Sequence, residues 1–308
     1  DVRFSFRMLP SEVVLQDLSA FVPAFKPFKE KLRLETEADG TVNQLNCPKL
    51  LISADNHFLL KGDVSLQDLS HPQDAYIFGN LSNLYADPDG IAFFVRNLSK
   101  DYKGVPPALQ HLGTISFRGE ISGYFTDLVT YGEVRTDIGT VKTDVKFSSD
   151  KEKGYFSYSG AVKTAEFELG KLLANDKFGK VTFNMDVKGS HYAKRYPSVT
   201  MKGLVASIDY SDYTYENITL DGEYKQGGFN GNVSFDDENG AIQLNGSINT
   251  AGKIPTFNFR ADVDHFRPNT LHLTPKYKDT EISVKIKADF TGSSINDMNG
   301  EINIDSLQ

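Results

Sequence analysis

The sequence predicts an all-β protein, an antiparallel sheet with a few short connecting helices. Three observations lead to this fold class: a strand pattern that recurs along most of the chain, turn motifs between its copies, and little helical periodicity. The chain has 308 residues, of which 39% are hydrophobic. That content is enough to bury a substantial apolar surface, and it excludes wholesale disorder.

The recurring pattern alternates apolar and polar residues around a central Gly or Ala, as in a strand with one buried face. Because strand side chains alternate between faces, the central small residue lies on the apolar face. Glycine in a strand costs about 0.5–1 kcal/mol relative to Ala, so its recurrence has a physical reason. Two interpretations stay open: a bend or close packing, and a shallow trough with room for a guest chain. Copies of the pattern occupy residues 60–66, 115–121, 199–205, 218–224, 229–235, 242–248, 257–263 and 298–304.

Turns and short helices connect these strands. Residues 236–240 and 87–90 combine Asp, Asn, Pro and Gly, which predicts hairpin tips. Residues 87–90 also resemble the start of a calcium loop, but the closing Glu of such a loop is missing. Helical periodicity is confined to residues 15–28, 165–173 and 264–273. Each of these segments has an apolar face, which predicts that it caps a sheet edge or a groove.

The domain organisation is only weakly marked. The stretch 99–113, which contains Gly104, Pro106 and Pro107, has the composition of a linker. We therefore predict an N-terminal, mostly β region with a short helix at residues 1–100. A region of repeated strands that form a groove is predicted at residues 101–308.

Charge and cysteine content exclude several classes of function. With 33 basic and 41 acidic residues the net charge is −8, the wrong sign for a nucleic-acid partner. The single cysteine, Cys47, cannot form an intramolecular disulfide and is interpreted as a small apolar residue. The sequence has neither the run of about 18 apolar residues of a transmembrane helix nor the pattern of a signal peptide.

The sequence starts and stops inside strand patterns, at residues 1–7 and 298–307. We therefore expect a piece of a longer protein, whose targeting and anchoring signals lie outside it. A sheet cut between strands exposes unpaired backbone groups, so end-to-end self-association is expected.

The motifs of enzyme chemistry are missing from the sequence. The six histidines include no pair at the helical spacing of zinc ligands. The sequence also has no nucleophile elbow, phosphate-binding loop or dinucleotide fingerprint. Paired acids such as Asp209 and Asp212 are expected in turn-like or outward positions, where solvation keeps both ionised. We predict a non-enzymatic protein with no catalytic residue, metal or cofactor.

The longer segments together resemble a known family. They are SEVVLQDLSAFVPAF (residues 11–25) leading into LRLETEADGTVNQL (32–45), LGTISFRGEISGYFTDLVTYG (112–132) with TDIGTVKTDV (136–145), and the repeats 217–235 and 241–263. In texture and order this chain is similar to the TamB branch of the AsmA-like superfamily, in its Bacteroidetes form.

The resemblance implies a β-taco, an elongated and curved antiparallel sheet that is incompletely closed around an apolar groove. It also implies a periplasmic protein whose parent is anchored in the inner membrane. A region outside this chain would meet an outer-membrane barrel of the BamA superfamily. The family takes part in outer-membrane biogenesis, both phospholipid transport and barrel-protein assembly, and brings no catalytic residues.

We therefore expect the Gly-bearing face to shield phospholipid acyl chains between the inner and outer membranes. Hiding one CH₂ from water is worth about 0.8 kcal/mol, so an exposed chain of about sixteen carbons costs roughly 13 kcal/mol. The alternative is that these side chains pack only on each other, as in a closed sandwich. The predicted lipid-binding residues are Phe117, Ile121, Leu220, Tyr224, Phe229, Val233, Phe235, Leu244, Ile248, Phe259, Val263 and Ile302.

Two other functions stay open from the sequence. One is a scaffold or chaperone that offers strand edges to outer-membrane barrel proteins during assembly and autotransporter translocation. The other is a β-sandwich surface-binding protein, which the scarcity of outward aromatic residues in the repeats disfavours. A single sheet of about 20 strands would form a rod of about 100 Å with a radius of gyration above about 29 Å, against about 19 Å for a compact domain.

Overall fold

The structure is a computed structural model that describes residues 2–19, 26, 28–41, 43–69, 71, 74–98, 104–150, 154–192, 198–276, 278–294 and 296–307. Of Leu18, Leu98 and Tyr192 it describes the backbone alone. The chain divides into two compact units, Asp1–Ser148 (unit 1) and Ser149–Gln308 (unit 2), and each is considered by itself.

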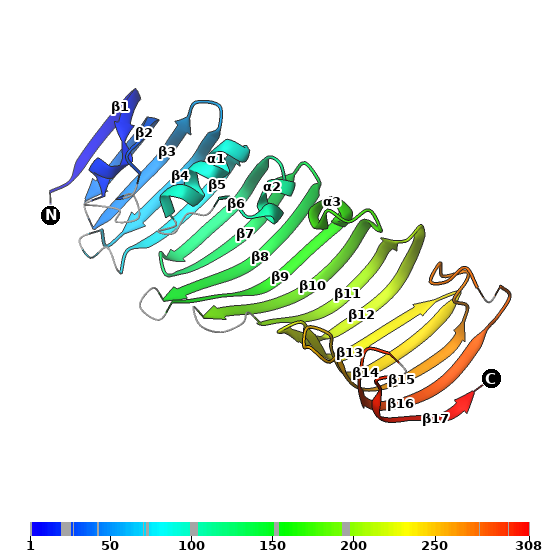
Figure 1. Ribbon diagram of the computed structural model, residues 1–308. Coiled ribbons are helices and arrows are strands. Elements are labelled where there is room, and N and C mark those ends of the chain that lie inside the picture. Colours follow the sequence, from blue (N-terminus) through cyan, green and yellow to red (C-terminus); the bar gives the residue numbers. More distant parts are fainter. Residues whose placement is uncertain are drawn as a thin grey trace. The chain divides into compact units, whose positions relative to one another are not determined.

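Unit 1 is an antiparallel sheet in which consecutive strands pair in chain order (Figure 1). Three short helical segments accompany the sheet. The elements are β1 (Phe4–Val14), η1 (Leu15–Leu18), β2 (Lys31–Thr41), β3 (Gln44–Ala54), β4 (Phe58–Gln67), β5 (Tyr76–Ala86), α1 (Pro88–Leu98), α2 (Pro107–His111), β6 (Ile115–Tyr124), β7 (Asp127–Thr136) and β8 (Gly139–Asp150).

Unit 2 repeats the same meander. Its elements are β9 (Tyr155–Glu168), α3 (Leu169–Leu173), β10 (Phe178–Tyr192), β11 (Ser198–Tyr210), β12 (Tyr213–Lys225), β13 (Gly228–Asp237), β14 (Gly240–Asn249), β15 (Thr256–Phe266), β16 (Ile282–Thr291) and β17 (Asn299–Leu307).

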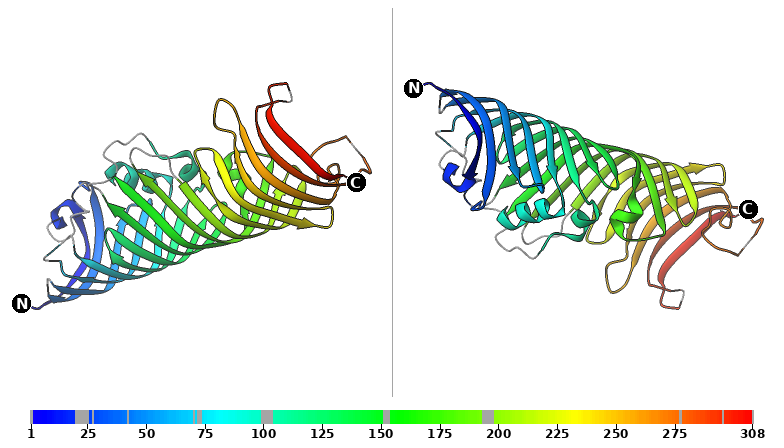
Figure 2. Two further views of the ribbon diagram at one scale, coloured as in Figure 1. Left: turned by 90° about the horizontal axis from the view of Figure 1, so that it is seen from below. Right: turned by 90° about the horizontal axis from the view of Figure 1, so that it is seen from above.

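The predicted fold class is confirmed, since the protein is all-β with curved antiparallel strands and a few short helices. Figure 2 shows the curvature of the strands within each unit. The described strands of each unit form one sheet rather than two stacked layers. Neither unit is therefore a two-sheet sandwich.

The hairpin predicted at residues 236–240 is confirmed. Asp237 of β13 pairs with Gly240 of β14, which leaves a two-residue turn between the strands. The Asp237 carboxylate accepts a hydrogen bond from the Asn239 backbone N–H at 2.9 Å. An Asp that bonds to the backbone two residues on is a usual turn device.

The hairpin predicted at residues 87–90 is wrong, because a helix begins there. Asp87 precedes α1, and its Oδ1 accepts the Gly90 backbone N–H at 2.8 Å. Pro88 takes the first helical position, where its fixed φ fits and its missing N–H is not needed. The residues that suggested a turn act here as a helix cap, and the sequence analysis missed α1.

The other helix predictions are right only in part. Of residues 165–173, only Leu169–Leu173 form helix α3, because residues 165–168 complete β9. Residues 264–266 end β15, and the rest of the segment to 273 consists of turns. Of residues 15–28, only Leu15–Leu18 are helical, as the short η1. Residues 20–25 and 27 lie outside the described residues.

The boundary predicted near residue 100 falls inside unit 1. Strands β5 and β6, on either side of it, pair at nine positions between Tyr76–Tyr124 and Ala86–Ile115. Helix α2 occupies part of the predicted linker, whose residues 99–103 are outside the described part of the chain.

Two clusters of buried side chains stabilise unit 1. The first joins Leu15, Phe28, Leu32, Ile52 and Phe58, with Phe93 and Phe94 of α1 packed against it. The second joins Val64, Leu81 and Phe117. In the part of the chain that the structure describes, no helix has both the length and the apolar character needed to cross a membrane.

Candidate functional site

Each sheet has an apolar and a polar face, because side chains alternate along every strand. In unit 2 the strand register lines up the apolar side chains of successive strands. One such row contains Leu220, Val233, Leu244, Ala261, Ile286 and Ile304, contributed in order by β12 to β17.

Further rows extend this apolar face of unit 2 on both sides. Toward one border lie Tyr224, Phe229, Ile248, Phe257 and Phe290, and the Phe257 and Phe290 rings stack at 4.7 Å. The rows bring together ten of the twelve predicted lining residues, namely Leu220, Tyr224, Phe229, Val233, Phe235, Leu244, Ile248, Phe259, Val263 and Ile302. The remaining two, Phe117 and Ile121, belong to unit 1.

The apolar face of unit 2 is neither a dry core nor a fully exposed surface. Phe235 is buried, Leu244 and Val233 are half-buried, and Tyr224 and Ile302 keep 48% and 44% of their surface exposed. A face with large apolar side chains in this condition has room to bury more surface against a ligand.

In unit 1 the two predicted lining residues pack in the same cluster and differ in burial. Phe117 is buried at 8% exposure and packs with Val64 and Leu81. Ile121 is half-buried between Gly79 of β5 and Thr130 of β7. Phe117 therefore belongs to a packed cluster and is not an open groove floor.

Aromatic rings fill the space above several of the recurring glycines. An ideal Cβ on Gly119 or Gly132 would lie 2.9 or 2.8 Å from the Phe117 ring, and one on Gly222 would lie 2.5 Å from the Phe229 ring. At these positions the structure favours close packing over an empty trough.

Gly246 has a backbone reason to be glycine. Its φ of +144° is a conformation that side chains disfavour, and an ideal Cβ would lie 2.2 Å from the Asn258 carbonyl oxygen on β15. Strands β14 and β15 therefore approach each other too closely for any other residue here.

One border of the unit 2 apolar face is covered by residues 267–273, the cover segment. Its Leu271 has no exposed surface, and the Leu271 carbonyl accepts a hydrogen bond from the Tyr215 hydroxyl at 2.7 Å. The His272 Nδ1 lies 3.0 Å from the Ser211 carbonyl. Contacts from the β15–β16 connection to β12 and the β11–β12 turn thus close this border. The sequence analysis predicted that residues 264–273 cap a sheet edge or a groove, but as a helix and without these partners.

Tyr213, the first residue of β12, also supports the cover segment. Its hydroxyl donates to the Asp237 carboxylate at 2.6 Å, and its ring packs on His272. Burial and then this hydrogen bond raise the pKa of Tyr213 to about 12. The hydroxyl therefore keeps its proton and serves as a structural donor.

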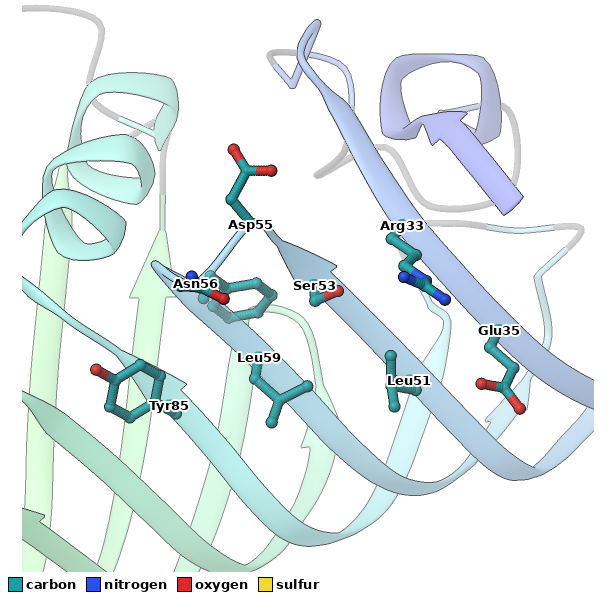
Figure 3. Close-up of a pocket in the computed structure, with 9 residues that line it drawn as sticks. Arg33, Glu35, Leu51, Ser53, Asp55, Asn56, Leu59 and Tyr85 are labelled. Atoms are coloured by element: carbon teal, nitrogen blue, oxygen red, sulfur yellow. The ribbon is translucent and has the colours of Figure 1, made fainter. Parts of the chain in front are cut away.

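The polar face of unit 1 has a hollow of about 440 Å³ across β2 to β5 (Figure 3). Arg33 and Glu35 project from β2, and Leu59 and Tyr85 from β4 and β5. The Lys49 ammonium hydrogen-bonds Glu35 and lowers the pKa of that carboxyl. A carboxylate that is held ionised in this way is a poor general acid.

His57, Asp87 and Asp89 form a possible cation site that the sequence analysis did not predict, with ligand atoms within 4.8 Å of one another. The His57 Nδ1 is 2.7 Å from the Asp87 carboxylate, whose other oxygen caps α1. The hydrogen bond to Asp87 raises the pKa of His57. Holding the β3–β4 turn against the start of α1 accounts for the arrangement.

Cys47 has the character expected from the sequence. It is buried in β3, and burial raises the pKa of its thiol. A protonated, inaccessible thiol is not a nucleophile.

No protein-family model, curated protein or solved structure matches this chain.

Proposed function

We propose that this chain is a non-enzymatic carrier surface for lipid acyl chains, with the apolar face of unit 2 as the binding surface. By the resemblance set out above, it would work in the periplasm during phospholipid transport between the inner and outer membranes. The parent protein would be anchored in the inner membrane.

The observation that carries the proposal is the set of apolar rows in unit 2, in register across β12 to β17, in which most of the large side chains are half-buried or exposed. An acyl chain laid along such a row is covered on one side over several strands, each about 4.8 Å from the next. At about 0.8 kcal/mol for each buried CH₂, covering half of a sixteen-carbon chain recovers about 6 kcal/mol.

A second candidate, a chaperone for outer-membrane barrel proteins, has support from β17. All nine of its residues are exposed, and it pairs with β16 along one edge. An exposed strand edge can add a strand from another chain. The molecule that the purified chain retains distinguishes the two candidates: a lipid for the carrier, and an extended polypeptide for the chaperone.

Leu244→Glu tests the proposal because it places a charge in the middle of the central row. The matched control is Ser247→Glu on the same strand, whose side chain lies on the polar face. Both chains would be secreted into the periplasm of a Gram-negative host and purified without detergent. We expect Leu244→Glu to lose most of the phospholipid that the original chain and the control retain.

Tyr224→Glu guards against a trivial failure to fold, since Tyr224 is on the same face and already 48% exposed. A carboxylate there stays hydrated, so the melting temperature should change little. If Tyr224→Glu and Leu244→Glu both fold and retain undiminished lipid, this face is not the binding surface.

A further inference from the structure

The polar face of unit 2 carries a second hollow, of about 560 Å³, lined by residues of β12 to β17. Four of these residues, Val233, Leu244, Ala261 and Ile286, belong to the central apolar row. Amides and hydroxyls line it on the side of β12 to β14, and charged side chains line it on the side of β15 to β17. It is on the opposite side of the sheet from the apolar rows, so it does not depend on the proposed lipid function.

Two cations face each other in this hollow. Arg260 of β15 and Lys287 of β16 are direct cross-strand partners. Like charges in directly opposite positions destabilise a sheet. Within the described residues, neither side chain makes an ion pair or a side-chain hydrogen bond.

Neighbouring cations on the same face form ion pairs with carboxylates. Lys285 pairs with Asp262 at 2.8 Å, and Lys202 pairs with Asp221 at 2.8 Å, both across adjacent strands. Asp262 is thus already engaged, and Asp305, the other carboxylate of the hollow, is within ion-pair distance of neither Arg260 nor Lys287. Two cations side by side without an ion-pair partner are what an anion-binding site requires before its ligand arrives.

The row that contains the pair continues into two amides. Asn245 faces Arg260 across β14 and β15, and Asn232 faces Asn245 across β13 and β14. The Asn245 Nδ2 donates to the Asn232 Oδ1 at 2.5 Å, which leaves the Asn245 oxygen and the Asn232 amino group available. The row therefore offers both donors and acceptors beside the two cations.

The charge of the lining limits the ligand. Three cations (Arg260, Lys285 and Lys287) and two carboxylates (Asp262 and Asp305) line the hollow, a net charge of +1. That balance suits a single acidic group and disfavours a polyanion. The amides beside it suit hydroxyl groups, which both donate and accept hydrogen bonds.

We propose that this hollow binds a hydroxyl-rich small molecule with one acidic group, a sugar acid or a sugar phosphate. The acidic group is held between Arg260 and Lys287, and hydroxyl groups of its body bond to Asn245 and Asn232. Because the hollow and the apolar rows are on opposite faces, lipid and this ligand bind independently.

Calorimetric titration with glucuronate, glucose 6-phosphate, glucose and inorganic phosphate tests the proposal on the complete chain. We expect saturable binding of at least one of the two acidic sugars and none of glucose. The acidic sugar that binds more tightly shows whether the hollow recognises a carboxylate or a phosphate. Inorganic phosphate that binds as tightly as both sugars would contradict the role of the amides, and absence of binding by both sugars would overturn the proposal.

The double variant Arg260→Gln/Lys287→Gln assigns the site. Its matched control is Lys163→Gln/Lys188→Gln, which removes two polar-face cations of β9 and β10 outside the hollow. The first should weaken binding at least about tenfold, and the control should not. Without ligand, the first should melt no lower than the original chain, because it relieves a repulsion. An equal loss of ligand affinity in both double variants would contradict the assignment. A clear drop in the melting temperature of Arg260→Gln/Lys287→Gln alone would also contradict it.

Discussion

At the scale of single residues, side-chain volume sets how closely neighbouring strands can approach. Gly246 and Gly79 both occupy strand interiors, yet their surroundings differ. A Cβ on Gly246 would meet the Asn258 carbonyl at 2.2 Å, whereas on Gly79 its nearest neighbour would be a Val64 methyl at 3.6 Å. The first distance demands a shift of backbone, and the second is ordinary contact.

Gly246→Ala should therefore lower the free energy of unfolding by about 1–3 kcal/mol through strain at a positive φ. Gly79→Ala should be neutral or stabilise by up to about 1 kcal/mol, because it restricts the unfolded chain. Urea denaturation of both variants measures the difference. Equal effects would show that backbone approach at β14–β15 does not require glycine.

Alternation predicted the face of every lining residue, because a period of two needs no tertiary information. It did not predict what covers that face. Phe117 lies over Gly119 of its own strand and Gly132 of the next, a contact that depends on register. The opposition of Arg260 and Lys287 also appears only once β15 and β16 are aligned.

At the scale of elements, the Asp87 carboxylate determines where α1 begins, directly after β5. Asp87 bonds to Gly90 with one oxygen and to His57 with the other. The composition of residues 87–90 fits a turn as well as a helix start, and composition alone does not distinguish the two. The hairpin at residues 236–240 was predictable because apolar alternation continues on both sides of it.

Asp87→Ala should lower the free energy of unfolding by about 0.5–2 kcal/mol through loss of the cap. Asp87→Asn keeps a capping oxygen and removes the charge, so it should cost less. Loss of helical signal together with a reduced denaturation midpoint, measured by circular dichroism, checks the first variant. Equal stability of all three chains would contradict the capping role.

The His57–Asp87 contact also predicts a pH dependence. The hydrogen bond to Asp87 raises the pKa of His57 above its ordinary value of 6.5. Stability from a raised histidine pKa is present below the ordinary value and is lost as pH rises through the raised value. In thermal melts, the melting temperature of the original chain should exceed that of His57→Gln by more at about pH 5.5 than at about pH 8.5. A difference in melting temperature that does not change with pH would refute this coupling. So would the same pH-dependent difference when both chains also carry Asp87→Asn.

At the scale of the whole molecule, the all-β class and the antiparallel order were predictable from strand period and turn spacing. The two-unit division was not, because the strands on both sides share one pattern and the composition changes little. The apolar face of residues 264–273 predicted a capping role for the cover segment. It did not predict the partners of Leu271, which is buried by contacts with β12 and β14, far away in sequence.

The exposed strand β17 predicts association. Its Ile302 and Ile304 keep 44% and 57% of their surface exposed. We expect concentration-dependent oligomers in sedimentation velocity, which Ile304→Lys should suppress because it places a charge in the apolar row that an added strand would extend. Asn303→Lys, on the polar face of the same strand, is the control. Sedimentation of the original chain as a monomer at high concentration would argue against an adhesive edge.

The central claim, that the apolar face of unit 2 carries acyl chains, is tested most directly by native mass spectrometry of the chain purified from the periplasm without detergent. The account predicts a folded species heavier than the polypeptide by the mass of one or more phospholipids, with the excess released on unfolding and identified by fragmentation. A folded chain that has only the mass of its polypeptide, after growth in cells rich in phospholipid, would contradict it.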